Sequence, residues 1–160
     1  MAEALDDCRP LAAERGVLLQ SQNAEPSTAS QLMVYSDRRV LLFILGQLLD
    51  NACKYADSPG GLVQLKLIQD LVAGRVCLQV WNNGPGVRPE DLPFIFDKGF
   101  SGQRPGQHAT GFGLYLARSY ARQLAIKLEI SADSACGQGF GIQMVFPGLK
   151  VQPRSLPGGD

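Results

Sequence analysis

The pattern of hydrophobic and polar positions divides the chain into helical and extended stretches. Hydrophobic residues recur with the period of an α-helix over 38–55, where Ser36 or Asp37 could cap the first turn, and again over 111–124. Shorter alternating or apolar runs predict strands at 17–20, 32–35, 62–69, 75–81, 126–131 and 140–146. Helices set between strands predict one α/β sandwich domain, in which helices cover one face of a sheet.

The segments between the predicted elements indicate a hairpin, mobile regions and one long loop. Only residues 70–74 separate two of the predicted strands, so we expect these strands to form a hairpin. Residues 21–30 and the tail from Val151 have the composition of mobile segments. The stretch between Gly99 and Gly113 has no regular period, and a loop of that length in a compact domain is usually functional. We expect a linker remnant at 1–10, the folded domain at 11–150 and a flexible tail at 151–160.

Composition narrows the possible functions. The 160 residues include 15 basic and 15 acidic side chains, and the absence of a basic excess argues against a nucleic-acid-binding protein. No apolar run approaches the ~20 residues that cross a bilayer, and the acidic start of the chain is unlike a signal peptide. We therefore expect a soluble cytoplasmic domain, with any membrane attachment in segments outside this chain.

The cysteines and the histidine set limits on metal and disulfide chemistry. The four cysteines are widely spaced, without a Cys-x-x-Cys pair, and there is one histidine. Two disulfides are possible in a secreted protein, but reduced structural thiols fit a cytosolic chain of this size better.

One face of the first predicted helix carries candidate chemistry. Gln47, Asn51 and Lys54 lie within about 60° of one another on a helical wheel, away from the hydrophobic arc. An amide oxygen suits Mg²⁺ and an ammonium suits phosphate, so this stripe could hold a metal-bound polyphosphate. Considered alone, it is more typical of an ordinary solvated helix face.

Two glycine-rich segments add to this stripe. The strand at 75–81 runs into Asn82-Asn83-Gly84-Pro85-Gly86, a tight turn that lets backbone approach a flat ligand. The second helix begins at Thr110-Gly111-Phe112-Gly113-Leu114, and helix N-termini bind anions. Each segment is weak evidence alone, but their order and separation together are specific.

Taken together, the motifs resemble the ATP-binding domain shared by sensor histidine kinases, DNA gyrase, Hsp90 and MutL, the GHKL or Bergerat fold. The resemblance covers about residues 11–147 and implies a two-layer sandwich, with a mixed, mostly antiparallel sheet of about five strands and about three helices. The Asn-Ala-x-Lys-Tyr form of the first motif and the phenylalanine-rich third motif point to the histidine kinases. The four matching motifs are an N box at 48–55, a glycine box at 82–86, an F box at 94–100 and a second glycine box at 111–114.

The resemblance implies a role for each matching residue. Asn51 would ligate Mg²⁺, Lys54 would contact the phosphates of ATP, and Tyr55 would contact the nucleoside. Asn82 would meet the adenine amino group, and residues 97–110 would form a lid over the ATP. The other nucleotide-binding residues that the resemblance implies are Gly84, Gly86, Lys98, Thr110, Gly111, Phe112, Gly113 and Leu114.

The chain departs from the family pattern at two positions. The adenine-reading residue is normally aspartate, whereas this chain has Asn82, which leads us to expect tighter ATP binding after Asn82→Asp. The hydrolytic members carry a glutamate base four residues before the N-box asparagine, whereas this chain has Gln47, which cannot accept a proton. Hydrolysis of the gyrase or Hsp90 type is therefore disfavoured.

These features predict the catalytic domain of a histidine kinase. It would bind Mg·ATP and donate the γ-phosphate to a histidine on a dimerisation hairpin outside this chain, with a response regulator as an indirect partner. Asn82 keeps open a rival hypothesis, a degenerate kinase-like module that regulates another protein with weak or no nucleotide binding. A third possibility, an anti-sigma-type Ser/Thr kinase of the same fold, fits the F box less well.

Overall fold

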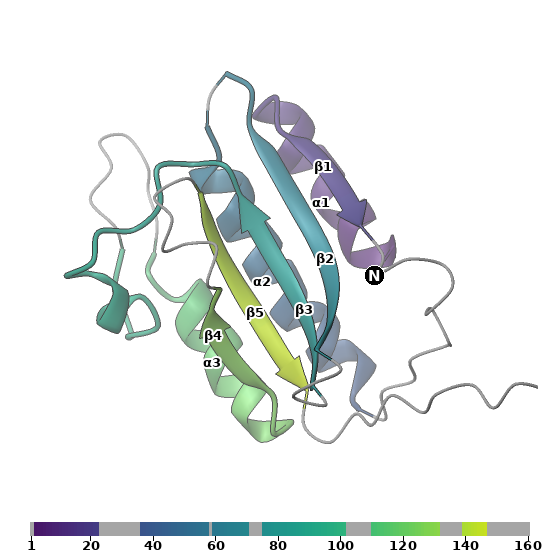
Figure 1. The fold of residues 1–160 in the computed structure, drawn as a ribbon, viewed down its shortest axis with the longest axis vertical. Coiled ribbons are helices and arrows are strands. Elements are labelled where there is room, and N and C mark those ends of the chain that lie inside the picture. Colours follow the sequence, from purple (N-terminus) through teal and green to yellow (C-terminus); the bar gives the residue numbers. More distant parts are fainter. Residues whose placement is uncertain are drawn as a thin grey trace, which may run out of the picture.

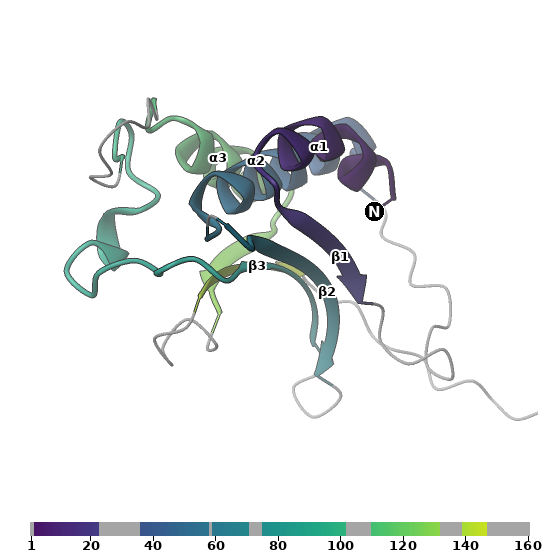
Figure 2. The same ribbon diagram turned by 90° about the horizontal axis from the view of Figure 1, so that it is seen from above.

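A five-stranded mixed sheet forms one layer of the domain and three α-helices form the other (Figure 1). The computed structural model describes residues 2–22, 36–57, 59–70, 75–101, 110–131 and 139–146, which contain all of these elements. All three helices lie on the same face of the sheet, as the view from above shows (Figure 2). The helices are α1 (Ala2–Glu14), α2 (Arg38–Tyr55) and α3 (Gly113–Gln123), with a short 3₁₀ turn at Leu92–Phe94. The strands are β1 (Leu18–Gln22), β2 (Leu62–Asp70), β3 (Arg75–Asn82), β4 (Lys127–Ile130) and β5 (Phe140–Phe146).

The sheet has the order β1-β2-β3-β5-β4 and confirms the predicted mixed, mostly antiparallel arrangement. Strand β1 runs parallel to β2, and every other neighbouring pair is antiparallel. Strands β2 and β3 pair from Val63 to Asp70 and from Arg75 to Asn82, as the predicted hairpin requires. The last residue of β3, Asn82, pairs with Val63 of β2 and with Phe140 of β5. Asn82 therefore lies at the end of the central strand of the sheet.

Helix α2 begins and ends where the periodicity predicts. Asp37 caps it, because its carboxylate accepts hydrogen bonds from the amides of Arg39 at 2.8 Å and Val40 at 3.2 Å. Its hydrophobic arc packs on the sheet as expected. The buried residues of the helix are Ile44, Leu45, Leu48, Leu49, Ala52 and Cys53.

Helix α1 corrects the expectation of a linker at 1–10. Pro10 stands inside this helix, and an internal proline disfavours a helix strongly enough to conceal the period in the sequence. The helix nevertheless buries Ala4, Cys8 and Ala12 in the core. Packing against α2 and the sheet therefore outweighs the cost of the proline.

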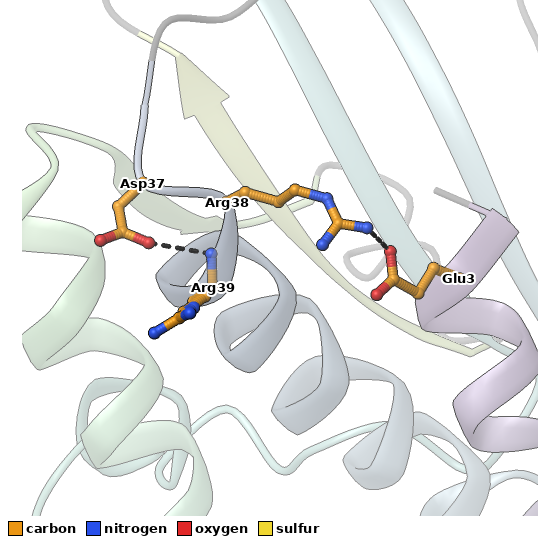
Figure 3. Close-up of polar contacts among 4 residues, drawn as sticks. All are labelled: Glu3, Asp37, Arg38 and Arg39. Atoms are coloured by element: carbon orange, nitrogen blue, oxygen red, sulfur yellow. Dashed lines mark hydrogen bonds and ion pairs between the residues drawn. The ribbon is translucent and has the colours of Figure 1, made fainter.

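An exposed ion pair also joins α1 to the first turn of α2. The guanidinium of Arg38 donates a hydrogen bond to the carboxylate of Glu3, beside the Asp37 cap (Figure 3). The two side chains are 73% and 46% exposed, and such a surface pair contributes no more than about 1 kcal/mol. The buried face of α1 therefore holds the helix in place.

Several sequence predictions fall on residues outside the described part of the chain. These are the strand at 32–35, most of the polar segment at 21–30, the tail at 151–160 and the lid between residues 102 and 109. Cys8, Cys53 and Cys77 are buried free thiols, in line with the reduced state expected, while Cys136 lies outside the described residues.

The core position of α1 can be tested with two neighbouring alanines. Ala12 is 3% exposed, whereas Ala13 points to solvent. We expect Ala12→Glu to lower the free energy of unfolding by about 2 kcal/mol or more, because it buries a charge, and Ala13→Glu to change it by less than about 0.5 kcal/mol. Urea denaturation measures both. Equal effects would mean that α1 is not part of the folded core.

Candidate functional site

A cavity of about 350 Å³ lies between α2, the loop that follows β3 and the start of α3. Its volume is within the range of small-molecule sites. Seventeen of the described residues, from distant parts of the sequence, line it. They are Gln47, Asp50, Asn51, Lys54, Tyr55, Asn82, Gly86, Val87, Arg88, Asp91, Ile95, Phe100, Thr110, Gly111, Gly113, Leu114 and Phe140.

Helix α2 contributes its polar stripe to this cavity. Gln47, Asn51 and Lys54 all line it, so the stripe is not merely a solvated face. The ammonium of Lys54 lies 2.5 Å from the carboxylate of Asp50, one turn earlier on the helix. Asp50 also lines the cavity, although the stripe predicted from the sequence did not include it. In the sequence, the feature that could have identified Asp50 is its position directly before Asn51.

The end of β3 is held against the end of α2. Asn82 is 2% exposed, and its Nδ2 donates a hydrogen bond of 3.3 Å to the backbone carbonyl of Tyr55. A Cβ atom on Gly84 would lie 1.7 Å from that same carbonyl oxygen, so only glycine permits this approach. Gly84 therefore supports the cavity wall from behind, while Gly86 lines the cavity itself.

Asn83 fastens the same turn to the start of β2. Its Oδ1 accepts hydrogen bonds from the amides of Leu62 at 2.9 Å and Asp57 at 3.3 Å, and its Nδ2 donates to the carbonyl of Gly60 at 3.0 Å. Two adjacent asparagines thus brace the turn, with Asn82 lining the cavity and Asn83 bonded to the segment that connects α2 to β2. In the sequence, Asn83 is distinguished only as part of the glycine box.

Two glycines bring the ends of the predicted lid together. The amide of Gly99 donates a 3.0 Å hydrogen bond to the carbonyl of Gly111. Gly111 has a φ of +69°, and a Cβ there would lie 2.4 Å from the backbone of Gly99. Directly after this contact α3 begins with Gly113 and Leu114, which both line the cavity.

The start of α3 provides a positive electrostatic environment. Among the residues that the structure describes, no side chain caps its first turn, and that turn contains no acidic residue. The free amides and the helix dipole therefore favour an anion at this end of the cavity. The side chain of Gln47 on α2 lies close to this helix start, because a Cβ atom on Gly113 would be 2.9 Å from the Gln47 Oε1.

A second group of charges follows the glycine box. Arg88 donates a hydrogen bond of 2.8 Å from Nε to Asp91 and lies 3.5 Å from Glu90. The hydrogen bond and the charge of Asp91 raise the pKa of Arg88 above its ordinary value. Neither Arg88 nor Asp91 was selected from the sequence, which gives no sign that this loop returns to the cavity.

The structure brings nine of the twelve predicted nucleotide-binding residues to the cavity and leaves three outside it. Gly84 lies behind the wall, as described above. Lys98 lies at a separate hollow of about 200 Å³ that it shares with Arg118 and Arg122. Phe112 is 42% exposed, with the Lys98 ammonium 5.9 Å from the centre of its ring.

The donor atoms of the cavity suit a hard cation held jointly with a ligand. No group of three or more His, Cys, Asp or Glu side chains that could hold a metal occurs among the described residues. Gln47, Asp50 and Asn51, whose side chains carry oxygens, nevertheless all line the cavity from α2. Mg²⁺ commonly takes one or two protein oxygens and completes its shell with phosphate and water, so these residues fit it.

The chain belongs to the histidine kinase-, DNA gyrase B- and HSP90-like ATPase family, whose model matches residues 36–150. Within this family it corresponds to the catalytic ATPase domain of sensor histidine kinases. It is 40% identical over 125 residues to the sensor protein BceS of Halalkalibacterium halodurans, covering 77% of this chain and 36% of that protein. It is 34% identical over 116 residues to the sensor histidine kinase GraS of Staphylococcus epidermidis, covering 71% of this chain and 32% of that protein. The chain thus spans about a third of the length of these relatives.

Solved structures confirm the fold. The mycobacterial sensor histidine kinase MprB superposes with a TM-score of 0.74 at 24% identity, over 94% of this chain and 97% of that one. The catalytic domain of the histidine kinase ThkA superposes with a TM-score of 0.71 at 20% identity, over 91% and 88%. In the described part of our chain, no helix is both long and apolar enough to cross a membrane.

The close approach of Gly84 to Tyr55 gives a testable prediction. We expect Gly84→Ala to lower the free energy of unfolding by about 2 kcal/mol, because its methyl group would collide with backbone. Gly46 of α2 is the matched control, since a Cβ there meets nothing within 4 Å. Gly46→Ala should raise the stability by up to about 1 kcal/mol through helix propensity. Chemical denaturation decides, and a neutral Gly84→Ala would refute the contact.

Proposed function

We propose that this chain binds Mg·ATP in the cavity and donates the γ-phosphate to a histidine on a dimerisation hairpin that lies outside it. The observation that supports this most directly is the convergence of the N box, both glycine boxes and Phe100 of the F box on one cavity. The relatives reported above are sensor kinases, and each is more than twice as long as this chain. The hairpin, a response regulator and any membrane attachment therefore belong to the proposal for the whole protein.

The cavity offers a separate environment for each part of the nucleotide. The purine would lie against Asn82 and Gly86, where buried polar and backbone groups meet an apolar wall. The phosphates would lie at the start of α3, near Thr110, Gly111 and Gly113, where free amides favour negative charge.

Helix α2 would hold the metal and neutralise the charge. Asn51 would ligate Mg²⁺ through its side-chain oxygen, while Asp50 and Gln47 supply further oxygens on the same wall. When bound, the cation would neutralise negative charge on the transferring phosphate. Lys54, whose ammonium pairs with Asp50, would add a second positive charge.

The proposed reaction requires positioning rather than a base from this chain. A neutral imidazole nitrogen of the acceptor histidine forms the new bond to the γ-phosphorus, while the bond to the β,γ-bridging oxygen breaks and ADP leaves. Stabilisation of the transferring group by charge and amides accounts for most catalysis of this kind. Gln47 has no carboxylate to take a proton from water, so the γ-phosphate would be preserved for the histidine.

Transfer itself is tested by mixing this domain with Mg·ATP and the separately produced hairpin of the same protein. We expect acid-labile phosphate on the hairpin, and none when its histidine is changed to glutamine. A hairpin that stays unmodified while the domain binds ATP would contradict the kinase proposal. If calorimetry detects no binding at millimolar Mg·ATP, the chain is instead a regulatory module.

The metal role of Asn51 has its own test. We expect Asn51→Ala to reduce Mg²⁺-dependent ATP binding at least about tenfold, because it removes a ligand from the cavity wall. The melting temperature should change little, since Asn51 is not among the buried residues of α2. Gln123→Ala, an exposed amide at the far end of α3, is the control and should bind ATP normally. A collapse of melting temperature in Asn51→Ala would show that the residue is structural.

A further inference from the structure

The hollow of about 200 Å³ lies between the segment that follows the 3₁₀ turn and one face of α3. Three cations line it, Lys98 from the segment and Arg118 and Arg122 from the helix. None of the described residues that line the hollow also lines the nucleotide cavity. The two sites are neighbours, because Ile95 and Leu114 of the cavity each stand directly before a residue of the hollow. The hollow is therefore a separate site that shares its backbone with the cavity.

The packing of α3 sets the direction of two of these cations. Ala117 and Ala121 are fully buried in the core, and Arg118 and Arg122 each follow one of them. The two arginines are four residues apart, so they lie on one face of the helix, where like charges repel. Within the described part of the chain, neither they nor Lys98 form an ion pair with a carboxylate. The fold thus gathers positive charge here without neutralising it.

Aromatic rings, rather than carboxylates, hold two of the cations. The guanidinium carbon of Arg118 lies 5.1 Å from the centre of the Phe96 ring, and Phe96 is itself buried. The ammonium of Lys98 lies 5.9 Å from the centre of the Phe112 ring. The face of a ring attracts and positions a cation but carries no net charge of its own. Both cations are therefore held in place with their full charge available to an anion.

Asp97 determines which anion suits the hollow, because it is the one acid among the described residues that line it. Three cations and one carboxylate leave two positive charges in excess, which matches a dianion. A carboxylate accepts hydrogen bonds but cannot donate them, so it favours an anion that carries its own O–H group. Hydrogen phosphate has two negative charges and an O–H group, whereas sulfate has the same charge without the O–H.

We propose that this hollow is a second anion site, which binds inorganic hydrogen phosphate through Lys98, Arg118 and Arg122 and selects it through Asp97. Arginine and lysine side chains are well suited to phosphate oxygens, and the Asp97 carboxylate accepts the O–H of the ligand. The volume is a little over half that of the nucleotide cavity, which favours a single phosphate over a whole nucleotide. The site does not depend on the proposed function, because neither ATP nor the hairpin takes part in it.

The experiment titrates the protein with phosphate, sulfate or glycerol phosphate at pH 8, with chloride keeping the ionic strength constant. The dianion of glycerol phosphate, like sulfate, has no O–H on its charged group. The readout is the nuclear magnetic resonance shift of the amides of residues 115–122. We expect saturable shifts with phosphate and roughly tenfold weaker binding of the other two anions, which meet the Asp97 carboxylate as acceptors. Shifts that do not saturate at millimolar phosphate would overturn the site, and equal affinity for sulfate would overturn the selection by Asp97.

Three variants test the residues assigned to the site. Arg118→Gln and Arg122→Gln should each weaken phosphate binding roughly tenfold, the effect of losing one hydrogen bond to a charged group. Arg122 is exposed, so its variant keeps the test decisive even if Arg118→Gln loses its packing on Phe96 and fails to fold. Asp97→Asn should bind phosphate and sulfate about equally, because an amide can donate to either. Phosphate affinity equal to that of wild type in Arg122→Gln would contradict the proposal.

Two further variants are controls for charge and for location. Arg9→Gln removes one exposed positive charge from α1, which lies on the other side of α2 from α3, as Figure 1 and Figure 2 show. Lys54→Gln removes a cation from the nucleotide cavity. Both should give the phosphate shifts of wild type in α3. Loss of these shifts in Lys54→Gln would place the phosphate in the cavity and overturn the proposal. A protein that binds phosphate in the hollow but does not bind Mg·ATP would contradict the proposed function alone.

Discussion

The rest of the structure depends on the packing of α2 against the middle of the sheet. Its 18 residues must bury one face and leave another open to the cavity. Because a helix turns by 100° per residue, the side chains that anchor it also fix the direction of Gln47, Asn51 and Lys54. A rigid hydrophobic contact thus sets the position of polar groups that have few packing constraints of their own.

The same packing brings backbone from distant parts of the chain into contact. The end of α2 meets the turn after β3, where Asn82, Asn83 and Gly84 bond or pack against residues 55–62. Backbone groups at a helix end normally need a partner outside the helix. Here the carbonyl of Tyr55 accepts a hydrogen bond from the side chain of Asn82 in the cavity wall. One hydrogen bond therefore stabilises both the end of α2 and the wall of the cavity.

Sequence reasoning succeeded where a local period or a compact motif carried the signal. Helix α2, strand β5 and the stripe on α2 follow from spacing within a single element. Helix α1 was missed because Pro10 argues locally against it, and only the tertiary burial of Ala4, Cys8 and Ala12 reverses that preference. Asp91 and Phe140 reach the cavity only through the topology, which no local pattern encodes. The orientation of the Asn82 amide required the position of a carbonyl 27 residues away.

The hydrogen bond between Gly99 and Gly111 has a consequence for how such domains diversify. This contact joins the two ends of the interval 99–111, so the positions of those ends beside the cavity do not depend on the residues between them. The entropy of closing a flexible loop grows only with the logarithm of its length, and doubling the length costs about 0.6 kcal/mol. Insertions and deletions in this interval should therefore be nearly neutral for folding. Evolution could then change the length of this interval while the contact between Gly99 and Gly111 stays in place beside the cavity.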